Sequence, residues 1–214
     1  MGTKKIMKCI IFSGADIFDY NFVASYIDED DFIICADSGV RHAEKLGLVA
    51  DVVIGDFDSV TDNGYKKHKE VVILPCEKDD TDTFAAAKIA AENSPDEVLI
   101  FGAIGSRIDH TLGNISTLEF LHQSGINARL INENNEIGII KNETKTVKKR
   151  KGSFLSLIPL DESVGSVSVS GVKYPLNDKT VYRNSTLTIS NEFRDDTADI
   201  SVKNGTMLYI ISKD

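Results

Sequence analysis

The stretch Val52–Ser59, V-V-I-G-D-F-D-S, decides the fold that the sequence predicts. Its apolar run ends at Gly55, and two carboxylates, Asp56 and Asp58, follow with one residue between them. If Val52–Ile54 is a parallel strand, the pair lies just past its carboxyl end, where open α/β sheets bind ligands. A hard divalent cation such as Mg²⁺ would remove the repulsion between the two carboxylates. A solvated Asx-type turn is the alternative, and the pair alone does not decide between them.

Similar apolar runs lie on both sides of this stretch and alternate with helical patterns. The runs are nearly continuous, which is typical of a parallel sheet covered by helices on both faces. The predicted strands are Cys9–Phe12, Phe32–Ala36, Val52–Ile54, Val71–Leu74, Val98–Phe101 and Asn127–Ile131. The predicted helices are Val40–Leu46, a segment capped by Asp80 or Thr81, and a segment from Asp109 with Leu112, Ile115, Leu118 and Leu121 on one face.

The pattern changes after about Glu133, where short β-rich pieces separated by turn residues replace the helices. Val167 and Val169 show the period-2 alternation of a half-buried strand. The basic cluster Lys145–Lys151 is interpreted as a solvated linker or hairpin, with attraction of an anionic ligand as the alternative. The sequence thus predicts an α/β domain at residues 1–135 and an all-β sandwich at residues 136–214. The strands expected there are Ile137–Ile140, Phe154–Ile158, Val164–Val169, Ser185–Ser190, Ala198–Val202 and Met207–Ile211.

Composition narrows the possible classes of protein. With 214 residues, 42% hydrophobic and 27% charged, the chain is typical of a globular protein with a substantial core. The net charge of −9 and the lack of a basic stripe argue against a nucleic-acid partner. Cys9, Cys35 and Cys76 are odd in number and widely spaced, which favours free buried thiols. No signal peptide or membrane span is recognised, so a cytoplasmic protein is expected.

Acidic or glycine-rich segments follow four of the first five predicted strands. In a parallel sheet these ends meet at one edge, where so many carboxylates require a cation. Glycines allow a close backbone approach to a ligand, and a guanidinium grips phosphate oxygens in bidentate fashion. The sequence therefore predicts a metal–phosphate site, although neither a P-loop nor a dinucleotide-binding fingerprint is present. The residues concerned are Asp37, Asp56, Asp58, Asp79, Asp80, Asp82, Gly102, Gly105, Arg107 and Asp109.

Four motifs along the α/β part carry a resemblance to a known family. They are A-D-S-G at Ala36–Gly39, G-D-F-D-S at Gly55–Ser59, D-T-D at Asp80–Asp82 and G-S-R-I-D-H at Gly105–His110. Their order and spacing resemble those of the thiamin pyrophosphokinase family. Near the end, Ile189–Phe193 (I-S-N-E-F) looks like the S-N element of that family on the thiamin-binding side. The likeness spans nearly the whole chain and matches the two domains of the family.

The resemblance implies that the pyrophosphoryl group of ATP is transferred to thiamin, giving thiamin diphosphate and AMP with Mg²⁺. It implies a catalytic, ATP- and Mg-binding domain at residues 1–135 and a thiamin-binding domain at residues 136–214. It also implies a homodimer with thiamin at the subunit interface. Asp56, Asp58 and Asp82 would hold Mg²⁺ and the triphosphate, and Arg107 and Asp109 would position phosphates and the hydroxyl. Ligand contacts are expected at Asp37, Ser38, Gly39, Gly102, Gly105, Arg107, Ser190, Asn191 and Tyr209.

Some questions stay open at this stage. The chain has no Trp, and Tyr209 either stacks on the thiazolium ring or is a core residue of a strand. Asp82 and Asp109 are both candidates to orient or deprotonate the hydroxyl. Three other functions compete: a pyrophosphokinase acting on a pterin-type alcohol, a D-x-D glycosyltransferase, and a non-enzymatic sensor with an acidic Mg²⁺ pocket. The S-N-E-F element favours thiamin over a pterin, and Lys141 does not fit the lysine that a sensor needs.

Overall fold

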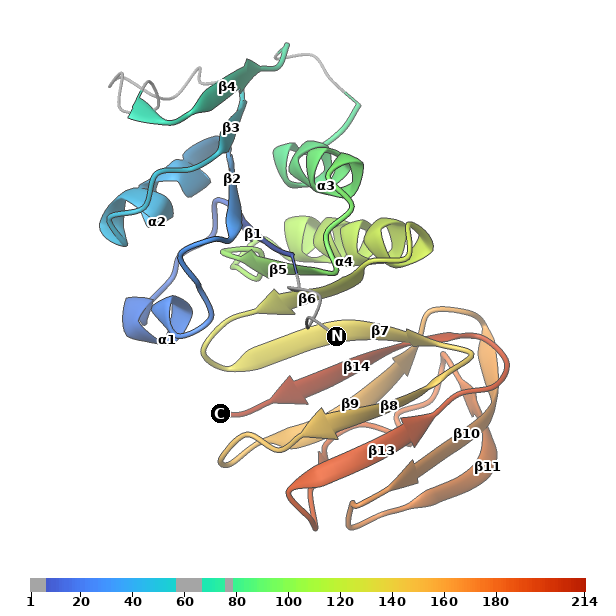
Figure 1. Ribbon diagram of the computed structural model, residues 1–214. Helices are drawn as coiled ribbons and strands as arrows, with labels where there is room; N and C mark the ends of the chain where they lie inside the picture. Colours follow the sequence, from blue (N-terminus) through green and yellow to red (C-terminus); the bar gives the residue numbers. More distant parts are fainter. Residues whose placement is uncertain (1–6, 57–66, 76–78) are drawn as a thin grey trace, which may run out of the picture. The chain divides into compact units, whose positions relative to one another are not determined.

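The computed structural model describes residues 7–56, 67–75 and 79–214 (Figure 1). Asp58 and Cys76, both named by the sequence analysis, lie outside these described ranges. The chain divides into two compact units, one up to Glu133 and the other from Asn134. The first unit is α/β and the second is all-β, which confirms the predicted fold class.

The first unit contains parallel strands with helices on both sides. The α1 and α2 helices lie on one side of the strands, and α3 and α4 lie on the other (Figure 1). In space the described strands follow the order β4-β3-β2-β1-β5-β6, and each adjacent pair is parallel. The strands are β1 (Lys8–Phe12), β2 (Phe32–Ala36), β3 (Val52–Gly55), β4 (Glu70–Ile73), β5 (Glu97–Phe101) and β6 (Asn127–Ile131). The helices are α1 (Tyr20–Ala24), the 3-10 turn η1 (Asp37–Gly39), α2 (Val40–Lys45), α3 (Asp82–Glu92) and α4 (Ile108–Gln123).

The strand order reverses between β1 and β5. From β1 the chain builds outward through β2, β3 and β4, and it then returns to the other side of β1 with β5 and β6. The loops that follow β1 and β5 therefore leave the sheet toward opposite sides. Such a reversal opens a crevice at the carboxyl ends of the two strands, and ligands of open α/β sheets bind there.

The interiors of β1, β2, β3 and β5 are apolar and buried, as the continuous runs predict, whereas β4 is half-buried to exposed. Thr81 caps α3 by accepting a hydrogen bond from the Phe84 amide, which confirms that cap. The apolar face predicted for α4 is partly wrong, because Leu112 is 59% exposed. Leu118 and Leu121 are buried there as predicted, together with polar Asn114 and Thr117. None of the described helices is long and apolar enough to cross a membrane.

The second unit consists of two antiparallel layers around an apolar core. One layer has the order β12-β9-β14-β7 and the other has β11-β10-β13-β8. Side chains from both layers, including Leu157, Val167 and Ile200, form one buried cluster. The strands are β7 (Asn135–Lys141), β8 (Thr144–Lys148), β9 (Phe154–Pro159), β10 (Ser163–Ser170), β11 (Leu176–Tyr182), β12 (Asn191–Glu192), β13 (Thr197–Ser201) and β14 (Thr206–Ser212).

Two predictions for this unit need correction, and one strand of seven residues was missed. The basic cluster Lys145–Lys151 begins inside β8, which pairs with β13, so its first half is strand rather than linker. The strand β11 was not predicted. The predicted strand Ser185–Ser190 is wrong, because the Ile189 amide bonds the Thr186 carbonyl in a turn and Ser190 has φ of 56°. Its apolar side chains are exposed, so alternation alone did not indicate a packed strand.

Candidate active site

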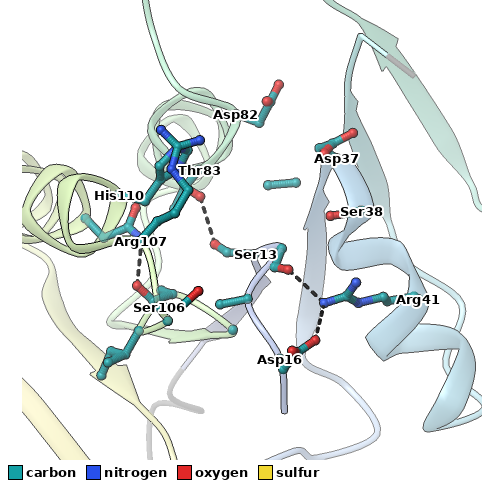
Figure 2. A pocket seen from close by; sticks show the side chains of 18 of the residues that line it. Ser13, Asp16, Asp37, Ser38, Arg41, Asp82, Thr83, Ser106, Arg107 and His110 are labelled. Carbon is teal, nitrogen blue, oxygen red and sulfur yellow. Dashed lines mark hydrogen bonds and ion pairs between the residues drawn. The ribbon is translucent and has the colours of Figure 1, made fainter. Parts of the chain in front are cut away.

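A cavity of about 560 Å³ lies at the reversal point of the first unit (Figure 2). Its walls come from the loops after β1 and β5, the turn η1 after β2, and the first turns of α3 and α4. Six of the predicted residues line it: Asp37, Ser38, Asp82, Gly102, Gly105 and Arg107. Residues that are far apart in sequence thus meet in one place, as the strand-end argument requires.

The loops after β1 and β5 are joined directly through their backbones. The Ser13 amide donates to Phe101 O, and the Ala15 amide donates to Gly102 O, both at 2.8 Å. Gly102 has φ of 64°, and a Cβ atom there would overlap the Ser13 carbonyl oxygen. Only glycine combines this left-handed backbone with so close an approach. Gly102 therefore shapes the floor of the cavity through its backbone.

Two consecutive residues of α2 hold the loop after β1. The Arg41 guanidinium donates to Gly14 O at 2.8 Å and pairs with Asp16 at 2.9 Å. The His42 ring nitrogen Nε2 donates to Ala15 O at 2.9 Å, and Nδ1 accepts from the Tyr20 hydroxyl at 2.8 Å. Burial lowers the pKa of His42 to about 4, so the ring is neutral near pH 7 and makes both bonds. Sequence reasoning missed Arg41 and His42, because no motif marks them.

Carboxylates line the wall formed by η1 and α3. Asp37 has φ of 48°, and its Oδ1 atom is buried with no hydrogen-bond partner among the described residues. A buried carboxylate oxygen without a partner is costly unless a cation or a ligand satisfies it. Asp82 begins α3, beside Thr83, whose hydroxyl lies 2.9 Å from that of Ser13. An oxygen-ligated cation such as Mg²⁺ fits this donor set.

The complete predicted metal set is not assembled in the part of the chain that the structure describes. No group of three His, Cys, Asp or Glu residues there is arranged to hold a metal ion. Asp56 directly follows β3 but does not line the cavity, and its partner Asp58 lies outside the described residues. Metal binding by Asp56, Asp58 and Asp82 therefore stays a prediction.

Arg107 and Asp109 form an exposed ion pair at the start of α4. The Arg107 Nη2 and Nε atoms donate to the two Asp109 oxygens at 2.6 and 3.2 Å. The guanidinium holds the pKa of the Asp109 carboxyl below its usual range, so Asp109 is ionised near pH 7. Arg107 lines the cavity, whereas Asp109 does not. The buried Asn114 donates to Ala103 O at 2.8 Å and fixes the loop that carries this pair.

Gly39 does not line the cavity. It is buried, and a Cβ atom there would overlap the Phe12 carbonyl oxygen. Its role in this structure is therefore to let η1 pack against the end of β1. Ser38 and Gly105, by contrast, both line the cavity.

The predicted thiamin-side residues lie in the second unit. The Asn191 amide accepts from Tyr174 N at 3.1 Å and donates to Tyr174 O at 2.8 Å. Asn191 and Tyr174 also line an apolar cavity of about 220 Å³. Ser190 is exposed, and its amide donates to the Ser156 hydroxyl. Tyr209 is 2% exposed within the core, with Lys145 Nζ 5.6 Å from its ring centre, which favours the core alternative.

Comparison with known proteins accounts for both units. Residues 23–130 match the catalytic domain of thiamin pyrophosphokinase, and residues 136–207 match its vitamin B1 binding domain. The chain belongs to the thiamin pyrophosphokinase family. It is 32% identical to thiamine pyrophosphokinase of Bacillus subtilis over 197 residues, which is 90% of this chain and 92% of that protein.

Solved structures of this family share the fold. The crystal structure of the Bacillus subtilis thiamine pyrophosphokinase matches with a TM-score of 0.88 and 30% identity, over 97% of this chain and 99% of that one. The structure of the Geobacillus thermodenitrificans thiamin pyrophosphokinase has a TM-score of 0.86 and 28% identity, over 97% of this chain and 98% of that one. These matches confirm the predicted family and its transferase class. The roles of individual residues stay predictions.

Proposed function

We propose that this protein transfers the pyrophosphoryl group of ATP to the hydroxyethyl oxygen of thiamin, giving thiamin diphosphate and AMP. The observation that carries the proposal is the cavity at the strand reversal, which gathers Asp37, Asp82 and Arg107. The catalytic-domain match covers most of this unit. The vitamin B1 binding match of the second unit favours thiamin over a pterin-type alcohol as the acceptor. Both matches also argue against a glycosyltransferase and a sensor.

Mg²⁺ is part of the proposal. Asp56, Asp58 and Asp82 would hold it, with Asp37 close by, and the buried unpartnered Oδ1 of Asp37 supports a cation near that wall. When bound, the ion neutralises phosphate charge and polarises the reacting phosphoryl group.

The residues of the chain contribute mainly position and charge. Attack by the thiamin oxygen on the β-phosphorus forms the new P–O bond and breaks the bond to the α-phosphate oxygen, releasing AMP. Arg107 lines the cavity and would bind phosphate oxygens, while Asp109 orients the guanidinium. Asp82 lines the cavity and Asp109 does not, so Asp82 is the better placed candidate to orient the hydroxyl.

The proposal includes a homodimer with thiamin at the subunit interface. Large apolar side chains remain exposed in each unit, among them Ile108 and Leu112 in the first and Leu187 in the second. Clusters of exposed apolar residues are typical of protein interfaces. A cytoplasmic location is also proposed, because Cys9 and Cys35 are buried free thiols, which suits a reducing compartment.

Product analysis tests the proposed activity. The protein is incubated with ATP, Mg²⁺ and thiamin, and the nucleotide and thiamin products are separated by chromatography. AMP and thiamin diphosphate are expected in equal amounts. ADP with thiamin monophosphate would indicate an ordinary kinase. No turnover would favour the non-enzymatic Mg²⁺-binding sensor. A pterin alcohol in place of thiamin should give no AMP above background.

A further inference from the structure

We infer that Phe18 is the surface on which the adenine ring of the nucleotide donor stacks, an inference that rests on the proposed function. Phe18 lies on the loop after β1 and lines the 560 Å³ cavity. It is 86% exposed, the highest value among the large apolar side chains of the described residues. Its neighbour Ile17 is 8% exposed and packs in the core. The loop thus buries one apolar side chain and presents the next to the cavity.

The exposure of Phe18 does not reflect a loosely attached loop. The amides of Phe18 and Asp19 both donate to one oxygen of Glu133, at 2.8 and 2.6 Å. The Asp19 carboxylate caps α1 by accepting from Phe22 N at 3.0 Å. On the other side, Ala15 is bonded through its amide to Gly102 and through its carbonyl to His42. A backbone held on both sides keeps the aromatic ring in place before a ligand arrives, which reduces the entropy lost on binding.

The position of Phe18 in the cavity suits the base of a nucleotide. Figure 2 shows Asp37 and Asp82 at one end and Asp16 at the other, with Ser13 between them. Phe18 lines the same cavity from the loop after β1, two residues after Asp16, whereas Asp37 and Asp82 come from η1 and α3. ATP carries its charge at the triphosphate and ends in a flat purine. With the triphosphate at the carboxylate wall, we infer that the purine lies against the loop after β1, which carries Phe18.

Stacking on an aromatic ring is chemically tolerant, because every base presents a π-face. Phe18 would therefore strengthen binding of adenine and guanine nucleotides alike, and would bind the smaller pyrimidine bases less tightly. Discrimination between ATP and GTP would have to come from hydrogen-bonding groups. The inference thus assigns Phe18 to affinity for purine nucleotides in general.

Binding measurements without turnover test this assignment. The affinities of ATP and of inorganic tripolyphosphate, each with Mg²⁺, are measured by titration calorimetry on the full chain. The variants are Phe18→Ala, Phe18→Tyr as a conservative rescue, and Ile73→Ala as a control, since Ile73 is exposed but does not line the cavity. Phe18→Ala should weaken ATP binding by about tenfold, within the range for loss of one base–aromatic stack. The affinity of Phe18→Ala for tripolyphosphate should stay at the wild-type level. Phe18→Tyr and Ile73→Ala should bind both ATP and tripolyphosphate as tightly as the wild type.

Several results would overturn the inference. Equal weakening of ATP and tripolyphosphate would mean that Phe18 only supports the loop. If Phe18→Ala binds ATP as tightly as the wild type but has a raised KM for thiamin, the ring contacts the acceptor instead. If Phe18→Ala has a lower molecular mass than the wild type by light scattering, the ring belongs to the subunit interface. If the wild-type protein does not bind ATP, stacking of the adenine ring on Phe18 is excluded. If ATP binding depends on Phe18 but no thiamin diphosphate forms, the inference stands and the proposed activity fails.

Discussion

The strand ends of the first unit and the start of β12 in the second unit use polar residues in opposite ways. At the strand ends, the Oδ1 atom of Asp37 is buried beside the 560 Å³ cavity and has no partner in the part of the chain that the structure describes. In the second unit, both polar groups of the Asn191 amide are hydrogen-bonded to the Tyr174 backbone. The difference shows that similar short motifs lead to different roles. In the proposed function the polar group of the first unit is kept for a ligand, whereas the second unit uses this amide to hold its own fold.

The largest effect is expected at the carboxylate wall of the first unit. Asp82→Asn removes a charge from the cavity and should lower the rate of AMP formation on the order of a hundredfold, as loss of an electrostatic contact to the reacting groups does. The control is Asp80→Asn, two residues away, because Asp80 pairs with Lys88 at 2.5 Å and does not line the cavity. Steady-state rates with saturating ATP and thiamin measure both variants. Equal rates for the two variants would contradict the assignment of Asp82.

The close contact between the loops after β1 and β5 gives the second prediction. Gly102→Ala should lower the free energy of unfolding by about 2–3 kcal/mol, because it combines backbone strain with a clash at Ser13. Gly47→Ala is the matched control, since Gly47 has φ of 70° but no atom within 4 Å of the added methyl group. It should cost about 1 kcal/mol from strain alone. Urea unfolding measures both, and equal losses would show that the contact is not rigid.

The two hydrogen bonds between the Asn191 amide and the Tyr174 backbone give a smaller effect. They test whether this amide stabilises the second unit. Asn191→Ala removes two hydrogen bonds to the exposed Tyr174 backbone and should cost about 1–2 kcal/mol of unfolding free energy. Ser190→Ala, which keeps the amide bond to Ser156, is the control and should leave stability within about 0.5 kcal/mol. A variant at Asn191 with wild-type stability and a raised KM for thiamin would mean that this amide is kept for the ligand.

The smallest effect concerns the pH dependence of stability. His42 takes up a proton near pH 4 in the folded state, against 6.5 for an ordinary histidine, because it is buried. Between these values the unfolded chain binds more protons, so stability falls as the pH drops from 6.5 toward 4. His42→Gln should remove about 1 kcal/mol of this dependence between pH 7 and pH 5. The control is His110→Gln, because His110 is exposed. The free energy of unfolding in urea is measured at several pH values. The same pH dependence for His42→Gln and wild type would contradict the assignment.

The strands of the first unit could be predicted because burial on both faces requires continuous apolar runs such as Phe32–Ala36. In the second unit, β8 and β11 were missed since they are edge strands of their layer with mostly polar side chains. The short helix α1 was missed because five residues are too few for a helical period. Local pattern thus indicates buried elements well, and it fails where pairing with a neighbouring strand supplies the stability.

The candidate active site likewise contains residues that a local sequence pattern indicates and residues that no pattern indicates. Asp37, Asp82 and Arg107 were found because they directly follow predicted strands or begin predicted helices. Phe18 and His42 were missed, since a single aromatic residue and a single histidine have no periodic or motif signal. Their roles depend on hydrogen bonds between segments distant in sequence, such as those from the amides of residues 18 and 19 to Glu133. Only the folded arrangement reveals such bonds.

We propose above that the cavity of the first unit transfers the pyrophosphoryl group to thiamin intact. The most direct test of this proposal uses ATP labelled at the γ-phosphorus, with Mg²⁺ and thiamin, followed by separation of the products. The label should appear in the terminal phosphate of thiamin diphosphate while unlabelled AMP is released in equal amount. Label in thiamin monophosphate with release of ADP, or label only in inorganic phosphate, would contradict it.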